Sequence, residues 1–445
     1  MTQAVSDFHQ QALSQWVGKS DKFQRLNADG SKAFEALPFP TRKTEAWKYT
    51  SLYALTQQDY NQAVATFDGA EVAANYQVDS LDVQQWVFVN GQFQANLSTQ
   101  KNESGLHMVR FSDASAEQLA LIEKHLGQVA ENERNLFTAL NNAQVQDGVF
   151  IYVEKNTQLT QPIHIVNVTT QQGQAASAFN RCLVVLDQLA QATVIEQFVS
   201  SDAEQDVLLN QVTEAVVGNG AQLQHYRLHK EHESSLHFGG VYVDLGRDSQ
   251  FNSYQVLLGG KVKRLDVLVN HNEGGSHCEM KGVYLPKNDQ HVDIHSYIEH
   301  KAAHCTTDEI YRGIMADQSK AVFNGRIHIH PDAQKTLAEL SNKNLLLSDK
   351  AQINTKPELE IYADDVRCAH GATVAQLDET AKFYLQSRGI SAQEADIMLS
   401  FGFINELLDS IPLEPLRVAL RPLLAQQFSS DRALTQHILH DEAGA

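Results

Sequence analysis

The chain has 445 residues, of which 42% are hydrophobic and 20% are charged, and its formal net charge is −19 at pH 7. This length favours roughly two or three domains over one core, and the balanced composition excludes a disordered chain. The negative charge argues against a nucleic-acid partner, because phosphate binding requires clustered Lys and Arg.

Targeting signals and cysteine usage indicate where the protein works. The N-terminal stretch MTQAVSDFHQ lacks the basic and apolar segments of a signal peptide, and no apolar run approaches the roughly 18 residues that span a bilayer. The cysteines form no CxxC pair and have no regular spacing: Cys182, Cys278, Cys305 and Cys368. We therefore expect a soluble cytoplasmic protein with reduced thiols and no membrane partner.

The N-terminal region, 1–145, has a mainly helical pattern. Residues 6–26 are predicted to form a helix capped by Ser6. Its apolar residues follow helical spacing: Phe8, Leu13, Trp16, Val17 and Phe23. In WVFVNGQFQ, Asn90-Gly91 predicts a hairpin with a type I′ turn. A second helical stretch is expected over Ser115–Asn142.

From residue 146 to residue 375 the chain changes to short β-type segments separated by Gly, Asn and Asp. No amphipathic helix of useful length interrupts this region, so the pattern argues against an open parallel sheet, whose crossovers need helices. A sandwich or barrel and a β-solenoid remain as alternatives. Strand-rich stretches recur loosely, as in the two pairs His277-Cys278 and His304-Cys305. The interval between these pairs suits the stacked coils of a solenoid.

Residues 376–445 return to a helical pattern and form the third predicted domain. Gly389 is well placed to end a helix over LDETAKFYLQSRG. SAQE is a capping box that opens the next helix, with Ser391 at the N-cap and Glu394 at N3. One side of that helix is apolar: Ile397, Met398, Phe401, Ile404 and Leu408.

The chain lacks the sequence motifs of several enzyme classes. It contains no GxxxxGK[ST] loop, no GxGxxG opening a helix, no GxSxG and no HExxH. No means of hydrolysing ATP or binding a dinucleotide is therefore recognisable, and no catalytic residue is predicted.

Histidine is concentrated in the β-region, where twelve of the nineteen lie between His225 and His330. RIHIHP places His328 and His330 on one face of a strand. A polar set in DIHSYIEH alternates with apolar residues and is expected to face outward: Asp293, His295, Tyr297 and Glu299. We interpret these residues as the polar outer surface of the β-domain. A metal site here would require histidines and carboxylates to converge from adjacent coils.

The segment DDVRCAHGAT places Cys368 and His370 two positions apart, on one face of an extended strand. A thiolate and an imidazole there could share one metal ion, but two donors do not complete a metal site. Either the other ligands come from elsewhere or the pair is ordinary packing. The pair lies where the β-region gives way to the C-terminal helices, and domain junctions favour sites.

Several stretches resemble the SufB/SufD family of iron–sulfur cluster assembly proteins. They include PTRKTEAWKYTSL, ALNNAQVQDGVFIYV, HVDIHSYIEHKAAHC, FNGRIHIHPDAQKT and the long run from NLLLSDKAQ through DDVRCAHGAT to FYLQSRGIS. The resemblance covers essentially the whole chain. Within the family, Gly371 after His370 favours the SufD branch, because SufB typically has an acidic residue at that position.

The resemblance implies a right-handed parallel β-helix between two helical regions, and a non-catalytic subunit of a SufB–SufC–SufD scaffold. It places His370 at the contact with SufB, where a transient iron–sulfur cluster is built and shared, with Cys368 as a second candidate ligand. It also implies that the ATPase SufC binds the C-terminal helices. The candidate docking residues are Ile397, Phe401, Ile404 and Leu408.

The resemblance further implies a cysteine desulfurase and its sulfur-transfer partner as indirect partners. It allows a flavin in the assembled complex and a homodimer of the isolated chain, in which no cofactor is expected. The alternative is a β-helix enzyme that acts on a carbohydrate in a surface groove, with acid–base pairs among Asp293, Glu299 and Asp308. No motif supports that alternative, and it explains neither helical end.

Overall fold

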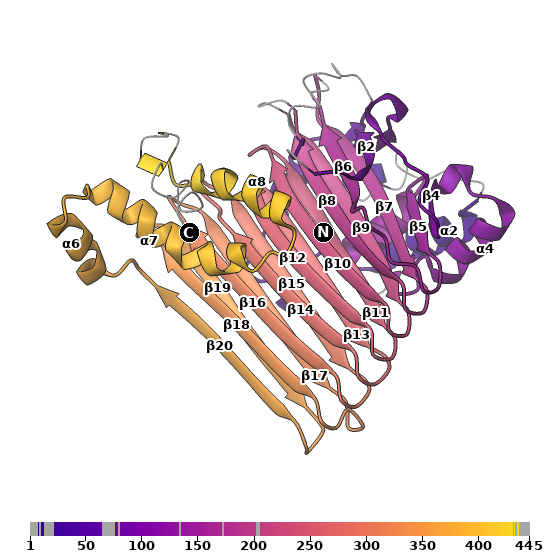
Figure 1. Cartoon of the computed structure of the whole chain (residues 1–445). Helices are drawn as coiled ribbons and strands as arrows, with labels where there is room; N and C mark the ends of the chain where they lie inside the picture. Colours follow the sequence, from indigo (N-terminus) through magenta and orange to yellow (C-terminus); the bar gives the residue numbers. More distant parts are fainter. Residues whose placement is uncertain are drawn as a thin grey trace.

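The protein is a parallel β-solenoid of about seven turns with helices at both ends, and it contains 43% strand and 23% helix (Figure 1). A computed structural model describes residues 8, 10–12, 22–64, 76–78, 81–132, 135–170, 173–201, 205–429, 431 and 434–435. Of the two arrangements left open by the sequence, the solenoid is confirmed and the sandwich or barrel is wrong.

Two ten-stranded sheets, sheet A and sheet B, form the long faces of the solenoid. Sheet A contains β1 (Asn61–Gln62), β4 (Leu106–Arg110), β5 (Val149–Val153), β7 (Ala176–Leu186), β9 (Val207–Val217), β11 (Leu236–Leu245), β13 (Val262–His271), β15 (His291–His300), β17 (Lys320–Ile329) and β19 (Gln352–Ile361). Sheet B contains β2 (Gln84–Val89), β3 (Gln92–Phe93), β6 (Ile163–Thr169), β8 (Gln191–Ser200), β10 (Gln222–Glu231), β12 (Gln250–Gly259), β14 (His277–Tyr284), β16 (Thr306–Met315), β18 (Leu337–Leu346) and β20 (Arg367–Ala375). From β5 onward, consecutive strands alternate between the sheets, so each coil contributes one strand to each sheet.

The coils stack in parallel register, and their length varies. Val262 lies beside Leu236, and Cys182 lies beside Val149, so the coil that begins at Val149 is the longer of the two. The recurrence seen in the sequence therefore reflects real coils. The example given for this recurrence, the pairs His277-Cys278 and His304-Cys305, was wrong in register, because His277 lies beside Thr306 and not beside His304.

Alternate side chains of each strand point into the space between the sheets, where they form one continuous apolar core along the solenoid. The predicted alternation in β15 follows this rule, with Ile294 and Ile298 in the core and Tyr297 and Glu299 partly exposed. Stacking identical strand faces buries the apolar side of every coil except at an end.

The N-terminal region covers part of sheet A. Its helices are α2 (Gln24–Ala36), α4 (Ala116–His125) and α5 (Leu136–Gln144), with short 3₁₀ turns at Glu45–Trp47, Tyr53–Thr56, Ala95–Leu97 and Phe111–Asp113. Helix α5 contacts β7, β9 and β11. There Phe137 stacks on Phe238 with ring centroids 4.1 Å apart. The region also supplies β2 and β4, which continue the two sheets beside β6 and β5, pairings that the sequence does not predict.

Two N-terminal predictions are tested directly. The hairpin is confirmed, since β2 and β3 pair across Asn90 and Gly91, whose φ values of 50° and 81° fit a type I′ turn. The helical stretch predicted over Ser115–Asn142 consists of two helices, α4 and α5, because α4 ends at His125 and Gly127 follows with a φ of 76°. Of the helix predicted over residues 6–26, Ser6, Leu13, Trp16 and Val17 lie outside the described residues; Phe8 is helical and buried.

The C-terminal helices are α6 (Glu379–Ser387), α7 (Ala392–Asp409) and α8 (Glu414–Ala425). Both predicted signals are confirmed: Gly389 follows α6 with a φ of 92°, and the Ser391–Glu394 capping box opens α7. Helix α7 contacts β14 and β16, so the chain folds back over the outer face of sheet B (Figure 1). None of the described helices is long and apolar enough to cross a membrane.

Candidate functional site

The solenoid ends in an open coil that carries the predicted Cys-x-His pair. Strands β19 and β20 each have a neighbouring strand on one side only, β17 and β18 respectively. In register, Cys368 lies beside Ala338 and His370 beside Leu340, two residues of the buried core. The pair therefore shares the face that points into the solenoid, as predicted from its spacing. Because no coil of the described chain follows, His370 is exposed and Cys368 is half-buried.

The two donors of the open coil differ in their chemistry. Burial raises the pKa of the Cys368 thiol, only partly offset by a hydrogen bond with the backbone of Ala338, so the thiol is protonated at neutral pH. Among the described residues, the His370 side chain has no hydrogen bond or ion pair, and no third His, Cys, Asp or Glu completes a ligand set with this pair. The imidazole of His370 is thus the more available donor, and the set is incomplete within the described chain.

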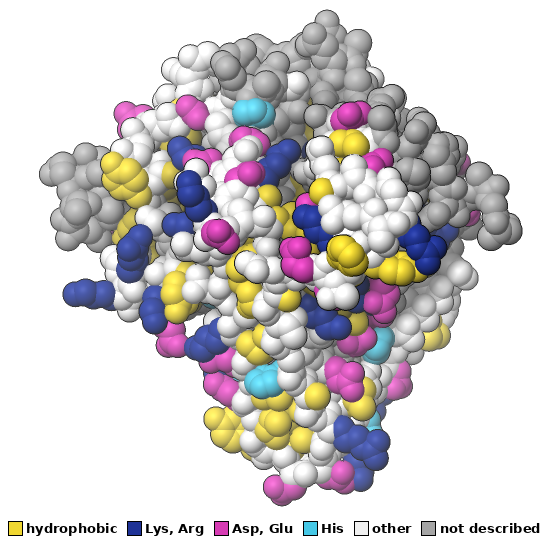
Figure 2. Space-filling view, turned by 90° about the vertical axis from the view of Figure 1, so that its left-hand side faces the viewer, with side chains coloured by type: hydrophobic (Ala, Val, Ile, Leu, Met, Phe, Trp, Pro, Cys, Tyr) yellow, Lys and Arg dark blue, Asp and Glu magenta, His cyan; other side chains and the backbone are white. Residues whose placement is uncertain are grey.

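The open end has the features of a surface for strand pairing. The outer edges of β19 and β20 carry unpaired backbone N–H and C=O groups, which template the addition of another strand. Large apolar side chains are exposed there as well: Ile361, Tyr362 and Val374. Figure 2 faces this end of the molecule and shows hydrophobic side chains interspersed with acidic and basic ones.

The C-terminal residues predicted to contact a partner are buried in the chain itself. Ile397, Phe401, Ile404 and Leu408 pack with residues of β12, β14 and β16 in one apolar cluster. In this structure they therefore hold α7 on sheet B and offer no surface to another protein. The exposed apolar residues of the C-terminal helices are different ones: Phe383 and Tyr384 on α6, and Val418 on α8.

The predicted polar set on β15 faces outward, but Asp293 is fully buried because the N-terminal segment covers it. Its Oδ2 accepts hydrogen bonds from Thr50 Oγ1 at 2.5 Å and from Arg264 Nη1 at 2.9 Å. Burial alone would raise the pKa of Asp293, but the charges of Arg264 and His295 hold it well below its usual value. This carboxylate is therefore an ionised structural group whose charge is balanced by Arg264.

The carbohydrate-enzyme alternative has no matching geometry among the described residues. Asp293 and Glu299 belong to β15 in sheet A, whereas Asp308 belongs to β16 in sheet B. Asp308 therefore cannot form an acid–base pair with the other two across one groove. Asp293 is in addition inaccessible to a substrate.

Three groups of described residues place potential metal ligand atoms within 4.8 Å of one another: His271, His300 and Cys305; His229, Glu231 and His237; and Glu299, His328 and His330. In the second group, the buried Lys263 ammonium lies 2.6 Å from Glu231 Oε2, so the carboxylate already has a cation. The first group is fully buried, and Ser276 and Thr307 satisfy His271 on both ring nitrogens. Only the third group is partly exposed.

Sequence reasoning placed His328 and His330 on one face but did not join them to Glu299. Glu299 lies beside His328 in the register of β15 and β17. Predicting this pair would have required the length of the coil between the two strands, which the sequence pattern does not give. The convergence from adjacent coils that a metal site requires is thus present at this position.

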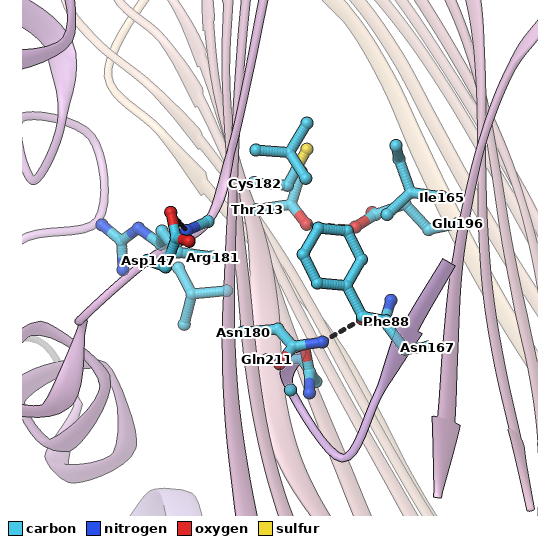
Figure 3. Close-up of a pocket in the computed structure, with 14 residues that line it drawn as sticks. Phe88, Asp147, Ile165, Asn167, Asn180, Arg181, Cys182, Glu196, Gln211 and Thr213 are labelled. Carbon is cyan, nitrogen blue, oxygen red and sulfur yellow. Dashed lines mark hydrogen bonds between the residues drawn. The ribbon is translucent and has the colours of Figure 1, made fainter. Parts of the chain in front are cut away.

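A small interior pocket lies near the N-terminal end of the solenoid (Figure 3). Phe88, Cys182, Thr213 and Glu196 point into it, and Asn180 of β7 donates a hydrogen bond to Asn167 of β6 across the sheets. Thr213 and Arg227 donate hydrogen bonds to Glu196 at 2.7 and 2.9 Å. Burial raises the pKa of the Cys182 thiol far above its usual value. Because the Glu196 carboxylate is hydrogen-bonded and the Cys182 thiol is unreactive, we interpret this pocket as a polar part of the solenoid core.

Comparisons with family models and with known proteins give the same family over most of the chain. Residues 167–403 match the family model for the SUF system FeS cluster assembly, SufBD core domain, and residues 3–165 match the SufBD protein N-terminal region. An iron–sulfur cluster assembly SufBD family protein of Synechocystis is 32% identical over 394 residues, covering 87% of each chain. The iron–sulfur cluster assembly protein SufD of Escherichia coli is 31% identical over 392 residues, covering 87% of this chain and 89% of the relative. SufD of Bacillus subtilis is 27% identical over 412 residues, covering 89% and 92%.

Proposed function

Because this chain belongs to the SufB/SufD family of the SUF iron–sulfur cluster assembly system, we propose that it acts there as the SufD-type scaffold subunit. Proteins of this kind are generally non-catalytic components of the assembly machinery. The proposed role is to hold a growing cluster and its partners in place, while a separate ATPase hydrolyses ATP.

The open coil is the observation that carries the proposal. His370 is exposed on the interior-facing side of β20, and Cys368 lies two positions before it on the same side. Imidazole and thiolate are both iron ligands, but this pair needs further donors. We propose that a SufB-like solenoid caps the open end and supplies them, so that the cluster is a transient substrate shared by two chains.

The same end provides the means of association. A strand of the partner can pair with the free edges of β19 and β20, and exposed apolar residues such as Val374 add buried area. Without that partner, a second copy of this chain would occupy the same edge and form the homodimer that we propose for the isolated chain. A cysteine desulfurase and its sulfur-transfer protein would act on this assembly indirectly, in the cytoplasm. No feature of the described residues supports a bound flavin, which is therefore not part of the proposal.

The C-terminal helices are proposed to bind the SufC-like ATPase. Their buried stripe stabilises α7 on sheet B, so the contact must use the outer surface. Phe383 and Tyr384 on α6, with side chains 71% and 56% exposed, are the strongest candidates. Aromatic residues of this size are frequent anchors at protein interfaces.

Co-purification tests this proposal. The tagged chain, produced with the SufB-like and SufC-like proteins of its own organism, should retain both. The substitution Val374→Asp places a charge on the interior-facing side of β20 and should release the SufB-like protein while the ATPase stays bound. If the Val374→Asp variant retained both proteins, the assigned contact would be contradicted. If the wild-type chain retained neither protein, the proposed function would be contradicted.

A further inference from the structure

We propose that Glu299, His328 and His330 form a binding site for a divalent first-row transition metal ion on the outer face of sheet A. The choice of Fe²⁺ as the natural ion rests on the proposed function, whereas the site itself rests on the geometry alone. It is separate from the Cys368 and His370 pair, which faces the solenoid interior.

The stacking of two coils creates the ligand set. Glu299 of β15 lies directly beside His328 of β17 in the parallel register, and His330 follows two positions later on the same side. All three ligand atoms lie within 4.8 Å of one another. Two ligand atoms bound to one ion at about 2.1 Å are separated by roughly 3.0–3.4 Å. Small rotations of these partly exposed side chains are enough to reach that spacing.

The two imidazoles lie side by side as neighbouring donors. Their rings are parallel within 8°, and their centroids lie 4.4 Å apart. Tyr297 Oη lies 3.1 Å from His328 Nδ1, which orients this ring and leaves Nε2 for an ion. His330 Nε2 is a buried atom with no hydrogen-bond partner, and it lies 3.9 Å from Glu299 Oε2.

Two histidines and one carboxylate match the chemistry of an exchangeable site. Fe²⁺ and Zn²⁺ bind such sets on one side and keep open coordination positions. Lys301 Nζ, 3.2 Å from Glu299 Oε2, is the cation that an incoming ion must displace, and its side chain is 36% exposed and able to turn away. Glu360 Oε2 lies 3.6 Å from His328 Nδ1, but it is already paired with the guanidinium of Arg326 and therefore adds no uncompensated charge beside the site.

The other two clusters lack these properties. In the His229, Glu231 and His237 group, the competing ammonium of Lys263 is fully buried and cannot leave. In the His271, His300 and Cys305 group, every member is buried, so an ion has no route from solvent. Only the Glu299 site combines donors, access and a movable competitor.

Metal titration of the isolated full-length chain tests the proposal. Chelator-treated protein is titrated with Co²⁺, whose visible bands report its ligands, and anaerobically with Fe²⁺ by calorimetry. One ion should bind per chain. Glu299→Gln and His330→Gln should each weaken binding by roughly ten-fold or more, and Lys301→Ala should strengthen it. His107→Gln is the matched control, because the His107 side chain is partly exposed like that of His330 and its Nε2 lies 2.7 Å from a carboxylate, Glu154, but it has no second histidine in its group.

Three results would overturn the site: binding only at millimolar metal, equal loss in His107→Gln, or unchanged affinity in the Glu299 and His330 variants with unaltered circular dichroism. These measurements need no partner protein and no cluster assembly. Metal binding by a chain that retains neither SUF partner would refute the proposed function and support the site. A functional complex whose isolated chain binds no metal would refute the site and leave the proposed function intact.

Discussion

Replacing His370 by alanine tests whether this residue is a metal ligand or a packing residue. Leu340 in the preceding coil provides the matched comparison. His370 lies directly beside Leu340 in the register of β18 and β20. Leu340 is 2% exposed in the solenoid core, whereas His370 is exposed at the open end. The two side chains thus occupy equivalent positions and differ in whether a further coil covers them.

The expected changes in stability follow from that difference. His370→Ala removes a side chain that no described coil covers, so it leaves no cavity and should change the free energy of unfolding by no more than about 0.5 kcal/mol. Leu340→Ala opens a cavity in the core and should cost about 2–5 kcal/mol. The alanine variant of His370 should also bind its partners normally, because the backbone edge of β20 is unchanged.

Both quantities are measured on one preparation. Urea denaturation followed by circular dichroism gives stability, and iron and sulfide content of the reconstituted complex gives cluster yield. His370→Ala should lower the yield sharply at unchanged stability, and Cys368→Ala should lower it less, because the Cys368 thiol is held protonated. A loss of stability comparable to that of Leu340→Ala would show that His370 is a packing residue. Normal cluster yield from His370→Ala would end its assignment as a ligand.

Two further predictions concern the core and the C-terminal helices. Burial raises the pKa of Glu309 from 4.5 to about 7, so the folded state holds a proton that the unfolded state has released. The free energy of unfolding should therefore fall by about 3 kcal/mol as the pH rises from 4.5 to 7, and Glu309→Gln should remove this slope in urea titrations; an unchanged slope would mean that another group titrates. On α6, Phe383→Glu should abolish capture of the ATPase without lowering the melting temperature, whereas the buried Phe401→Ala should destabilise the chain by about 3–5 kcal/mol. Full ATPase capture by Phe383→Glu would place the docking surface elsewhere.

The structure also changes how the C-terminal region should be tested. Deletion of residues 376–445 would remove α7 and uncover the apolar residues that it buries on sheet B. Loss of ATPase binding by such a truncation could then reflect exposure of core surface. Surface substitutions on α6 avoid that difficulty because they leave the packing of α7 intact.

Features that depend on a few neighbouring residues could be predicted from the amino-acid sequence alone. The turn at Asn90-Gly91, the end of α6 at Gly389 and the Ser391 capping box follow from backbone conformations that those residues favour. The alternation in β15 and the shared face of Cys368 and His370 follow from the two-residue period of a strand. None of these predictions depends on which residues from distant parts of the chain pack against the residue in question.

Which distant residues meet became known only from the folded chain. Coil length varies along the chain, so the sequence pattern does not reveal that Glu299 lies beside His328. Asp293 follows the outward period of its strand yet is buried, because Thr50, far away in the sequence, folds over it. His370 follows the inward period yet is exposed, because no described coil continues the stack. A period fixes the direction of a side chain, whereas its burial depends on the element packed against it, and that element comes from elsewhere in the chain.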